Sequence, residues 1–190
     1  MKYDRERFFA AVRPMFPKGK LTPDQVKGME FILTAWETMY PQGSLKFLAY
    51  ALATTFHETA YTMLPIEEYG RGKGRKYGPT GFWGRGYVQL TWDYNYAKAT
   101  TRLRELGLID DTVDFTKTPD LVMRPEFAVI ILFVGMIEGW FTKKRLGTYF
   151  DGTKADAVGA RRIINGTDEA EKIAGHYRKF VSALLFAEVK

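Results

Sequence analysis

Apolar residues recur at helical spacing along most of the chain. Residues 4–12 show this spacing, and Pro14 ends the first predicted helix. Thr22 followed by Pro23 is typical of a helix start, because a threonine side chain caps free amide groups and proline fits the first helical position. The second predicted helix, residues 23–40, has its apolar stripe at Val26, Met29, Ile32, Leu33 and Trp36.

A third predicted helix starts after Ser44, a residue type that can cap it. Glu58 lies about 140° around this helix from the centre of its apolar stripe. Its neighbours on that side are the small residues Ala51, Thr54 and Thr55, so a ligand has room to approach the carboxylate. The stripe itself consists of Leu45, Leu48, Leu52 and Phe56.

Residues 65–86 have a different texture, rich in glycine and basic residues, including the stretch "GRGKGRKYG" at residues 70–78. Irregular segments of this length in a compact domain are commonly functional, and we expect at most a short β-hairpin here. The basic stretch lacks the Gly-x-x-x-x-Gly-Lys-Ser/Thr order of a nucleotide-binding loop. It predicts either contact with an anionic glycan or a solvated turn.

The rest of the chain favours helices. Residues 87–107 are expected to begin extended and become helical, and residues 118–142 to form a turn and then a buried helix. Two further helices are expected within residues 154–166 and 168–189. No repeat, linker or low-complexity tail interrupts the pattern, so the predicted class is mainly α, one domain over residues 1–190.

Composition narrows the chemistry. The chain has 46% hydrophobic and 26% charged residues, as soluble globular proteins do. It has no cysteine and only two histidines, which excludes disulfides and thiolate metal sites, and we expect no metal and no cofactor. The net charge of +6 favours anionic partners such as nucleic acid or an acidic polysaccharide. The longest apolar run is far below the ~20 residues of a membrane span, and no secretory signal is visible.

Glu58, Glu67 and Glu68 are the candidate reactive carboxylates. A straight helix would hold them too far apart, but Pro65 disfavours helical continuation and allows the chain to fold back. Two carboxyl groups at roughly 6.5–9.5 Å suit an inverting glycosidase, in which one acts as acid and the other activates water. Spacing alone favours solvated surface charges, the commoner situation for glutamate.

The segment "WGRGYVQLTWDYNY", residues 83–96, changes this balance. It combines closely spaced glycines, amide and hydroxyl side chains and several aromatic rings, a mixture that suits a sugar chain. For Trp92 and Tyr94 both core packing and cleft lining stay open, whereas the other aromatic residues of the segment are expected to line a cleft.

This segment resembles the signature of glycoside hydrolase family 19, whose fold is shared by plant-type chitinases and many phage endolysins. The matching positions are Trp83, Gly84, Arg85, Gly86, Gln89, Leu90, Thr91, Tyr94, Asn95 and Tyr96. His57, Glu58 and Thr59 are similar to the family's His-Glu-Ser/Thr segment, and "RRIINGT" is similar to its Ile-Asn-Gly motif. The resemblance covers residues 44–177 and implies a lysozyme-like α-helical fold.

The resemblance also implies roles. Glu58 is the expected general acid, and Thr91 is expected to hold the attacking water. Glu68 follows a Pro-hydrophobic-x pattern as in endolysin-like members and is the expected base, with Glu67 as the alternative. The expected substrate-binding residues are Tyr61, Arg85, Gln89, Tyr94, Asn95 and Asn165. His57 is expected to orient the helix end rather than react.

The function implied is that of a monomeric endolysin-type muramidase acting on the glycan strand of peptidoglycan. Lacking a signal, it is expected in the bacterial cytoplasm, with release to the wall through a separate pore-forming protein. A chitinase acting on N-acetylglucosamine polymers is the alternative within the same class. A basic module that binds nucleic acid or glycan without catalysis is the alternative from another class, although the sequence carries no recognised nucleic-acid motif and no nucleic-acid partner is expected.

Overall fold

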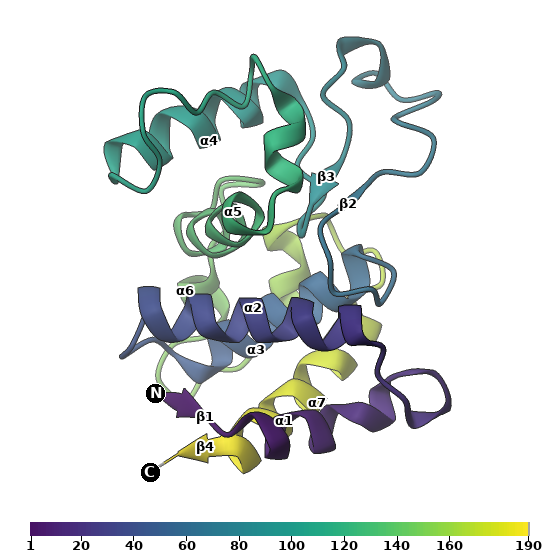
Figure 1. The fold of residues 1–190 in the computed structure, drawn as a ribbon, viewed down its shortest axis with the longest axis vertical. Coiled ribbons are helices and arrows are strands. Elements are labelled where there is room, and N and C mark those ends of the chain that lie inside the picture. Colours follow the sequence, from purple (N-terminus) through teal and green to yellow (C-terminus); the bar gives the residue numbers. More distant parts are fainter. Residues whose placement is uncertain (190) are drawn as a thin grey trace.

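Helices dominate the computed structural model, which describes residues 1–189 (Figure 1). The α-helices are α1 (Arg5–Val12), α2 (Pro23–Met39), α3 (Leu45–Glu58), α4 (Asp93–Glu105), α5 (Pro125–Glu138), α6 (Leu146–Tyr149) and α7 (Ala170–Ala187). The strands are β1 (Lys2–Tyr3), β2 (Ile66–Glu67), β3 (Arg85–Gly86) and β4 (Glu188–Val189). Short 3-10 helices span Arg13–Met15, Pro17–Gly19, Gly78–Thr80, Pro119–Met123 and Gly159–Ile163. The predicted mainly α class is confirmed.

The helix start predicted at Thr22 is confirmed in detail. The Thr22 hydroxyl accepts a hydrogen bond from the Gln25 amide at 3.2 Å, and the Gln25 side chain accepts one from the Thr22 amide at 2.9 Å. This reciprocal pair satisfies two amides at the start of α2, with Pro23 in the first turn. Ser44 precedes α3 as expected, but its side chain makes no capping hydrogen bond.

The core is built around α3, α5 and α7. Residues 128–136 of α5 are all buried, as the continuous apolar run predicted. α7 packs against α3 and α1, where the rings of Phe8 and Phe180 stack with centroids 6.5 Å apart. β1 and β4 pair antiparallel and join the two ends of the chain. In Figure 1, α4 lies at the opposite end of the molecule from α1 and α7, with α5 between them. Within residues 1–189, none of the helices is long and apolar enough to cross a membrane.

The irregular segment contains the short hairpin that the sequence allowed. β2 and β3 pair antiparallel, with Ile66 opposite Gly86 and Glu67 opposite Arg85. The 17 intervening residues, 68–84, have no further strand. The hairpin turns the chain back after α3, so Glu68 returns towards the helix that ends at Glu58.

One predicted helix is wrong. Residues 154–166 form only the 3-10 turn Gly159–Ile163 rather than an α-helix. The Asp156 carboxylate accepts a hydrogen bond from the Gly159 amide at 2.8 Å, which tightens the chain into a turn. Gly166 then adopts a positive φ of 31°, which ends any helical continuation. This turn brings Asn165 beside the end of α3.

Substitution of Gly28 in α2 tests whether close packing of α2 against the chain reversal after α3 stabilises the fold. A Cβ atom at Gly28 would lie 2.0 Å from the carbonyl oxygen of Met63, which belongs to the reversal. Because the obstacle is backbone, we expect Gly28→Ala to lower the free energy of unfolding by about 1–3 kcal/mol. Urea denaturation measures this. Gly175→Ala in α7, where the nearest atom is an arginine side-chain nitrogen at 3.9 Å, is the matched control and is expected to be neutral or stabilising. Equal losses for both variants would contradict the explanation.

Candidate active site

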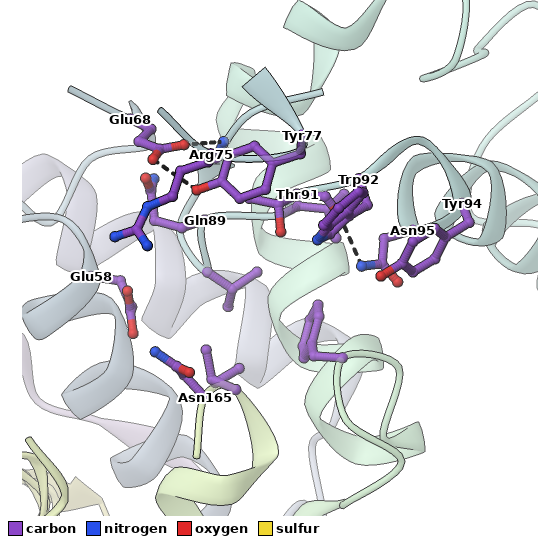
Figure 2. Close-up of a pocket in the computed structure, with 15 residues that line it drawn as sticks. Glu58, Glu68, Arg75, Tyr77, Gln89, Thr91, Trp92, Tyr94, Asn95 and Asn165 are labelled. Carbon is purple, nitrogen blue, oxygen red and sulfur yellow. Dashed lines mark hydrogen bonds between the residues drawn. The ribbon is translucent and has the colours of Figure 1, made fainter. Parts of the chain in front are cut away.

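A cleft of about 540 Å³ gathers most of the residues singled out from the sequence. Its walls come from the end of α3, the turn after β2, the segment between β3 and α4, and the turn after Gly159–Ile163. Figure 2 shows Glu58 and Asn165 on one side of this cleft and Glu68, Gln89 and Thr91 on the other. The predicted residues that line it are Glu58, Glu68, Gln89, Thr91, Tyr94, Asn95 and Asn165.

Glu58 is the last residue of α3, and a buried arginine holds it. Its Oε1 atom accepts a hydrogen bond from Arg161, whose side chain is only 3% exposed against 15% for Glu58. The Arg161 Nε atom donates to the Asp168 carbonyl at 2.9 Å, which fixes the guanidinium in turn. Since only one oxygen of Glu58 is used in this pair, the carboxylate is oriented while the other oxygen stays available to the cleft. Arg161 was missed from the sequence, although it stands inside the "RRIINGT" motif.

His57 does not line the cleft. Burial lowers the pKa of its imidazole from the usual value and outweighs the opposing attraction of Glu58. A neutral, half-buried imidazole beside the helix end agrees with the expected packing role rather than with chemistry on a ligand.

Glu68 is held at both carboxylate oxygens. Oε1 accepts a hydrogen bond from the Tyr77 hydroxyl at 2.9 Å, and Oε2 accepts one from the Gly84 amide at 3.0 Å (Figure 2). Burial and this contact with Glu68 raise the pKa of the Tyr77 phenol, so it stays a hydrogen-bond donor at neutral pH. At Gly84 a Cβ would lie 2.8 Å from the Gln89 Oε1 atom and 3.2 Å from the Glu68 Cβ, so a larger residue would displace the side chain of Gln89.

Glu67 is the last residue of β2 and points away from the cleft, because successive side chains of an extended chain face opposite sides. Its carboxylate accepts hydrogen bonds from the Trp83 indole at 2.7 Å and from the Arg71 Nε atom at 2.9 Å, and Arg85 lies 3.7 Å away. Burial alone would raise the pKa of the Glu67 carboxyl, but these partners outweigh it and hold the pKa below its usual value. Glu67 does not line the cleft, so the geometry favours Glu68 as the second carboxylate.

The amide side chains of the cleft are held by backbone contacts. Gln89, at a positive φ of 53°, donates from Nε2 to the Ile66 carbonyl at 3.0 Å. Asn95 donates to the Thr91 carbonyl at 2.9 Å. Asn165 receives its position from the turn, where its backbone amide donates to the Arg161 carbonyl at 3.0 Å. Gln89 and Asn95 thus have fixed amides at the cleft, as recognition of N-acetyl and hydroxyl groups requires.

The structure decides the two aromatic positions that the sequence left open and corrects two others. Trp92 and Tyr94 line the cleft, with stacked rings 5.9 Å apart, and Tyr94 is 61% exposed. Tyr87 and Tyr96 are buried in the core instead. Trp92 has a positive φ of 69° at the start of α4, a conformation that no residue pattern predicts.

Tyr61 and Arg85 do not line the cleft, so the structure does not bring them together with the other predicted substrate-binding residues. The Tyr61 ring packs against Phe56, with centroids 4.6 Å apart. Arg85 is 4% exposed; its guanidinium lies 4.5 Å from the centroid of the Trp83 ring. Arg85 thus links β3 to Glu67 of β2 and to Tyr96 of α4 beneath the cleft.

Two cleft residues come from the loop between the strands and were not predicted individually. Arg75 and Tyr77 both line the cleft, and they belong to the basic stretch "GRGKGRKYG". The sequence indicated that this stretch is basic, but the path of a glycine-rich loop cannot be read from its residues. Among residues 1–189, no group of three or more histidine, aspartate or glutamate side chains is placed to hold a metal ion.

Neither a sequence-family profile nor a curated protein sequence matches the chain. Solved structures do. Chitinase C from Streptomyces griseus HUT6037 matches 97% of this chain over 94% of its own, with 20% identity and a TM-score of 0.54. A bacterial family 19 chitinase matches 94% of this chain over 93% of its own, with 21% identity and a TM-score of 0.52. The chain has the lysozyme-like fold of the family 19 chitinases.

Proposed function

We propose that the protein is a glycoside hydrolase that cleaves the glycan strand of bacterial peptidoglycan with inversion at the anomeric carbon. The observation that carries the proposal is the placement of two glutamates, Glu58 and Glu68, on opposite sides of one cleft, with Thr91 on the same side as Glu68 (Figure 2). An acid and a base that face each other across the substrate are what inversion requires.

In this mechanism the Glu58 carboxylic acid gives its proton to the glycosidic oxygen as the bond from that oxygen to the anomeric carbon breaks. A water molecule held by Glu68 and Thr91 attacks the anomeric carbon from the opposite face. Glu68 takes the proton of this water, and the new hydroxyl has the inverted configuration. Arg161 keeps one oxygen of Glu58 occupied, so the other oxygen is the one that faces the leaving group.

Substrate contacts follow from the remaining cleft residues. The side-chain amides of Gln89, Asn95 and Asn165 suit the N-acetyl groups and hydroxyls of the sugar rings. The exposed ring of Tyr94, stacked on Trp92, offers an apolar face to a sugar. We propose that the enzyme acts as a monomer.

Peptidoglycan and chitin both contain N-acetylglucosamine, so the choice of peptidoglycan as the substrate polymer needs its own argument. The net charge of +6 favours binding to the anionic wall polymer and so supports peptidoglycan as the substrate. Chitin is the second candidate, supported by the chitinases among the similar structures. With peptidoglycan as substrate, an endolysin role is proposed, in which the enzyme is made in the bacterial cytoplasm and reaches the wall through a separate pore.

The test compares purified peptidoglycan, outer-membrane-permeabilised Gram-negative cells and colloidal chitin. We expect loss of turbidity with the cells, and mass spectrometry of the soluble products is expected to find new reducing-end muramic acid. Turnover of chitin alone would replace the proposal by the second candidate. Salt-dependent DNA binding without cleavage of either glycan would overturn both in favour of a binding module.

A further inference from the structure

The loop between β2 and β3 contains a cluster of positive charge. Residues 69–81, here called the basic loop, hold four basic residues and no acidic one: Arg71, Lys73, Arg75 and Lys76. Arg71 pairs with Glu67 at 2.9 Å. Within residues 1–189, no ion pair involves any of the other three.

Backbone contacts and hydrogen bonds within the basic loop define its conformation. A Cβ at Gly78 would lie 2.2 Å from the Gly72 carbonyl oxygen, so the two ends of the charged stretch touch backbone to backbone. The Arg75 amide donates to the Gly72 carbonyl at 2.8 Å, and its own carbonyl accepts from the Gly78 amide at 3.1 Å. The hydrogen bond from Tyr77 to Glu68 then ties the loop to the cleft. These contacts give Arg75 a defined position.

Arg75 is the one cation of the basic loop that lines the cleft, and Figure 2 shows its guanidinium in the space between Gln89 and Glu58. The structure shows no hydrogen bond or ion pair from this guanidinium to Glu58 or Glu68, although both line the same cleft. A planar guanidinium is suited to pairing with a carboxylate through two parallel hydrogen bonds.

We infer that Arg75 determines substrate specificity by binding a carboxylate that the glycan carries near the bond to be cleaved. In peptidoglycan every second sugar bears a lactyl ether, whose carboxyl group is either free or joined to a peptide with carboxylates of its own. Chitin has no such group. The inference rests on the proposed function and names the residue that separates the two polymers.

Three variants and three substrates test it. The variants are Arg75→Gln, Arg75→Lys and Lys76→Gln, the last being a neighbour on the same loop that loses the same charge but does not line the cleft. The substrates are glycan strands with stem peptides, strands stripped of peptides by an amidase so that the lactyl carboxylates are free, and a neutral chito-oligosaccharide.

We expect Arg75→Gln to lower kcat/KM on carboxylate-bearing strands by about 10-fold or more, the usual size of a charge-assisted hydrogen bond. The loss on the chito-oligosaccharide is expected to be at least several-fold smaller. Arg75→Lys restores part of the activity, and Lys76→Gln matches the wild type. A loss confined to stripped strands identifies the lactyl carboxylate as the bound group, and a loss confined to peptide-bearing strands identifies the peptide.

An equal loss on all three substrates, or no loss on any, would overturn the inference. If the wild type cleaves no glycan at all, the proposed function fails, and calorimetry decides the inference separately. Stripped strands are titrated into wild type, Arg75→Gln and Lys76→Gln. Binding weakened about 10-fold in Arg75→Gln alone supports the carboxylate contact, and equal binding by all three refutes it.

Discussion

Replacing Glu58 by glutamine is expected to lower kcat on peptidoglycan strands by about 10²- to 10⁴-fold, the usual contribution of general acid–base catalysis. Glutamine has the shape of glutamate but carries no proton to give to a leaving oxygen. KM is expected to change little, since the amide fills the same space in the cleft. Initial rates on soluble strands, followed by reducing-end release, measure both constants.

The glutamine keeps one carbonyl oxygen that can accept from Arg161, so the fold is expected to survive. Thermal unfolding followed by circular dichroism checks this. Glu37→Gln is the matched control, because Glu37 also pairs with an arginine, the partly buried Arg5, at 2.7 Å, but lies outside the cleft. Glu37→Gln is expected to keep full activity. Full activity in Glu58→Gln would reduce Glu58 to a structural partner of Arg161 and remove the proposed acid.

Local signals in the sequence predicted much of the fold. Thr22 with Pro23 marked the start of α2 because capping depends on adjacent residues only, and the capping box has this form in the structure. The apolar run in residues 127–137 predicted a buried helix for the same reason. Residues 154–166 were predicted wrongly because one side-chain contact, from Asp156 to the Gly159 amide, favours a turn over a helix. Such competition is decided by a single contact and leaves no periodic pattern.

The site was predicted unevenly. Glu58, Gln89 and Thr91 were placed through resemblance to a known motif, and the structure brings them to one cleft. Arg85 belongs to the same motif but is buried under the hairpin, because a motif preserves positions without saying which support the fold. The contact of Arg161 with Glu58 could not be predicted from residue spacing, because the two residues lie 103 positions apart in the chain. Contacts between distant segments follow from the tertiary fold rather than from local sequence.

The choice between Glu67 and Glu68 illustrates the same point. Two adjacent glutamates are equivalent in a sequence, but the pairing of β2 with β3, which the Glu68 amide extends by donating to the Gly84 carbonyl at 2.8 Å, turns them to opposite sides. One faces Trp83 and Arg71, and the other faces the cleft. The register in which β2 pairs with β3 thus determines which of the two glutamates faces the cleft and is the proposed base. A shift of one residue would exchange the two carboxylates.

Glu68→Ala is therefore expected to lower kcat by about 10²- to 10⁴-fold, whereas Glu67→Gln keeps activity within a few-fold of the wild type. Glu67→Gln instead is expected to lower the free energy of unfolding, because it removes the charge that pairs with Arg71 and Arg85. Steady-state rates and urea denaturation of the two variants separate catalysis from stability. Loss of activity in Glu67→Gln with retention in Glu68→Ala would assign the base to Glu67 and contradict the geometry of the hairpin.

Chemical rescue distinguishes a base from a residue that only shapes the cleft. Azide is an anionic nucleophile that needs no deprotonation, and the alanine at position 68 leaves room for it beside Thr91. Added azide is expected to raise the rate of Glu68→Ala and to yield a glycosyl azide of inverted configuration, identified by proton NMR. Glu58→Gln is expected to gain nothing from azide on the same substrate, because its leaving group still lacks a proton. Equal rescue of both variants, or of neither, would contradict the assignment of Glu68 as base and Glu58 as acid.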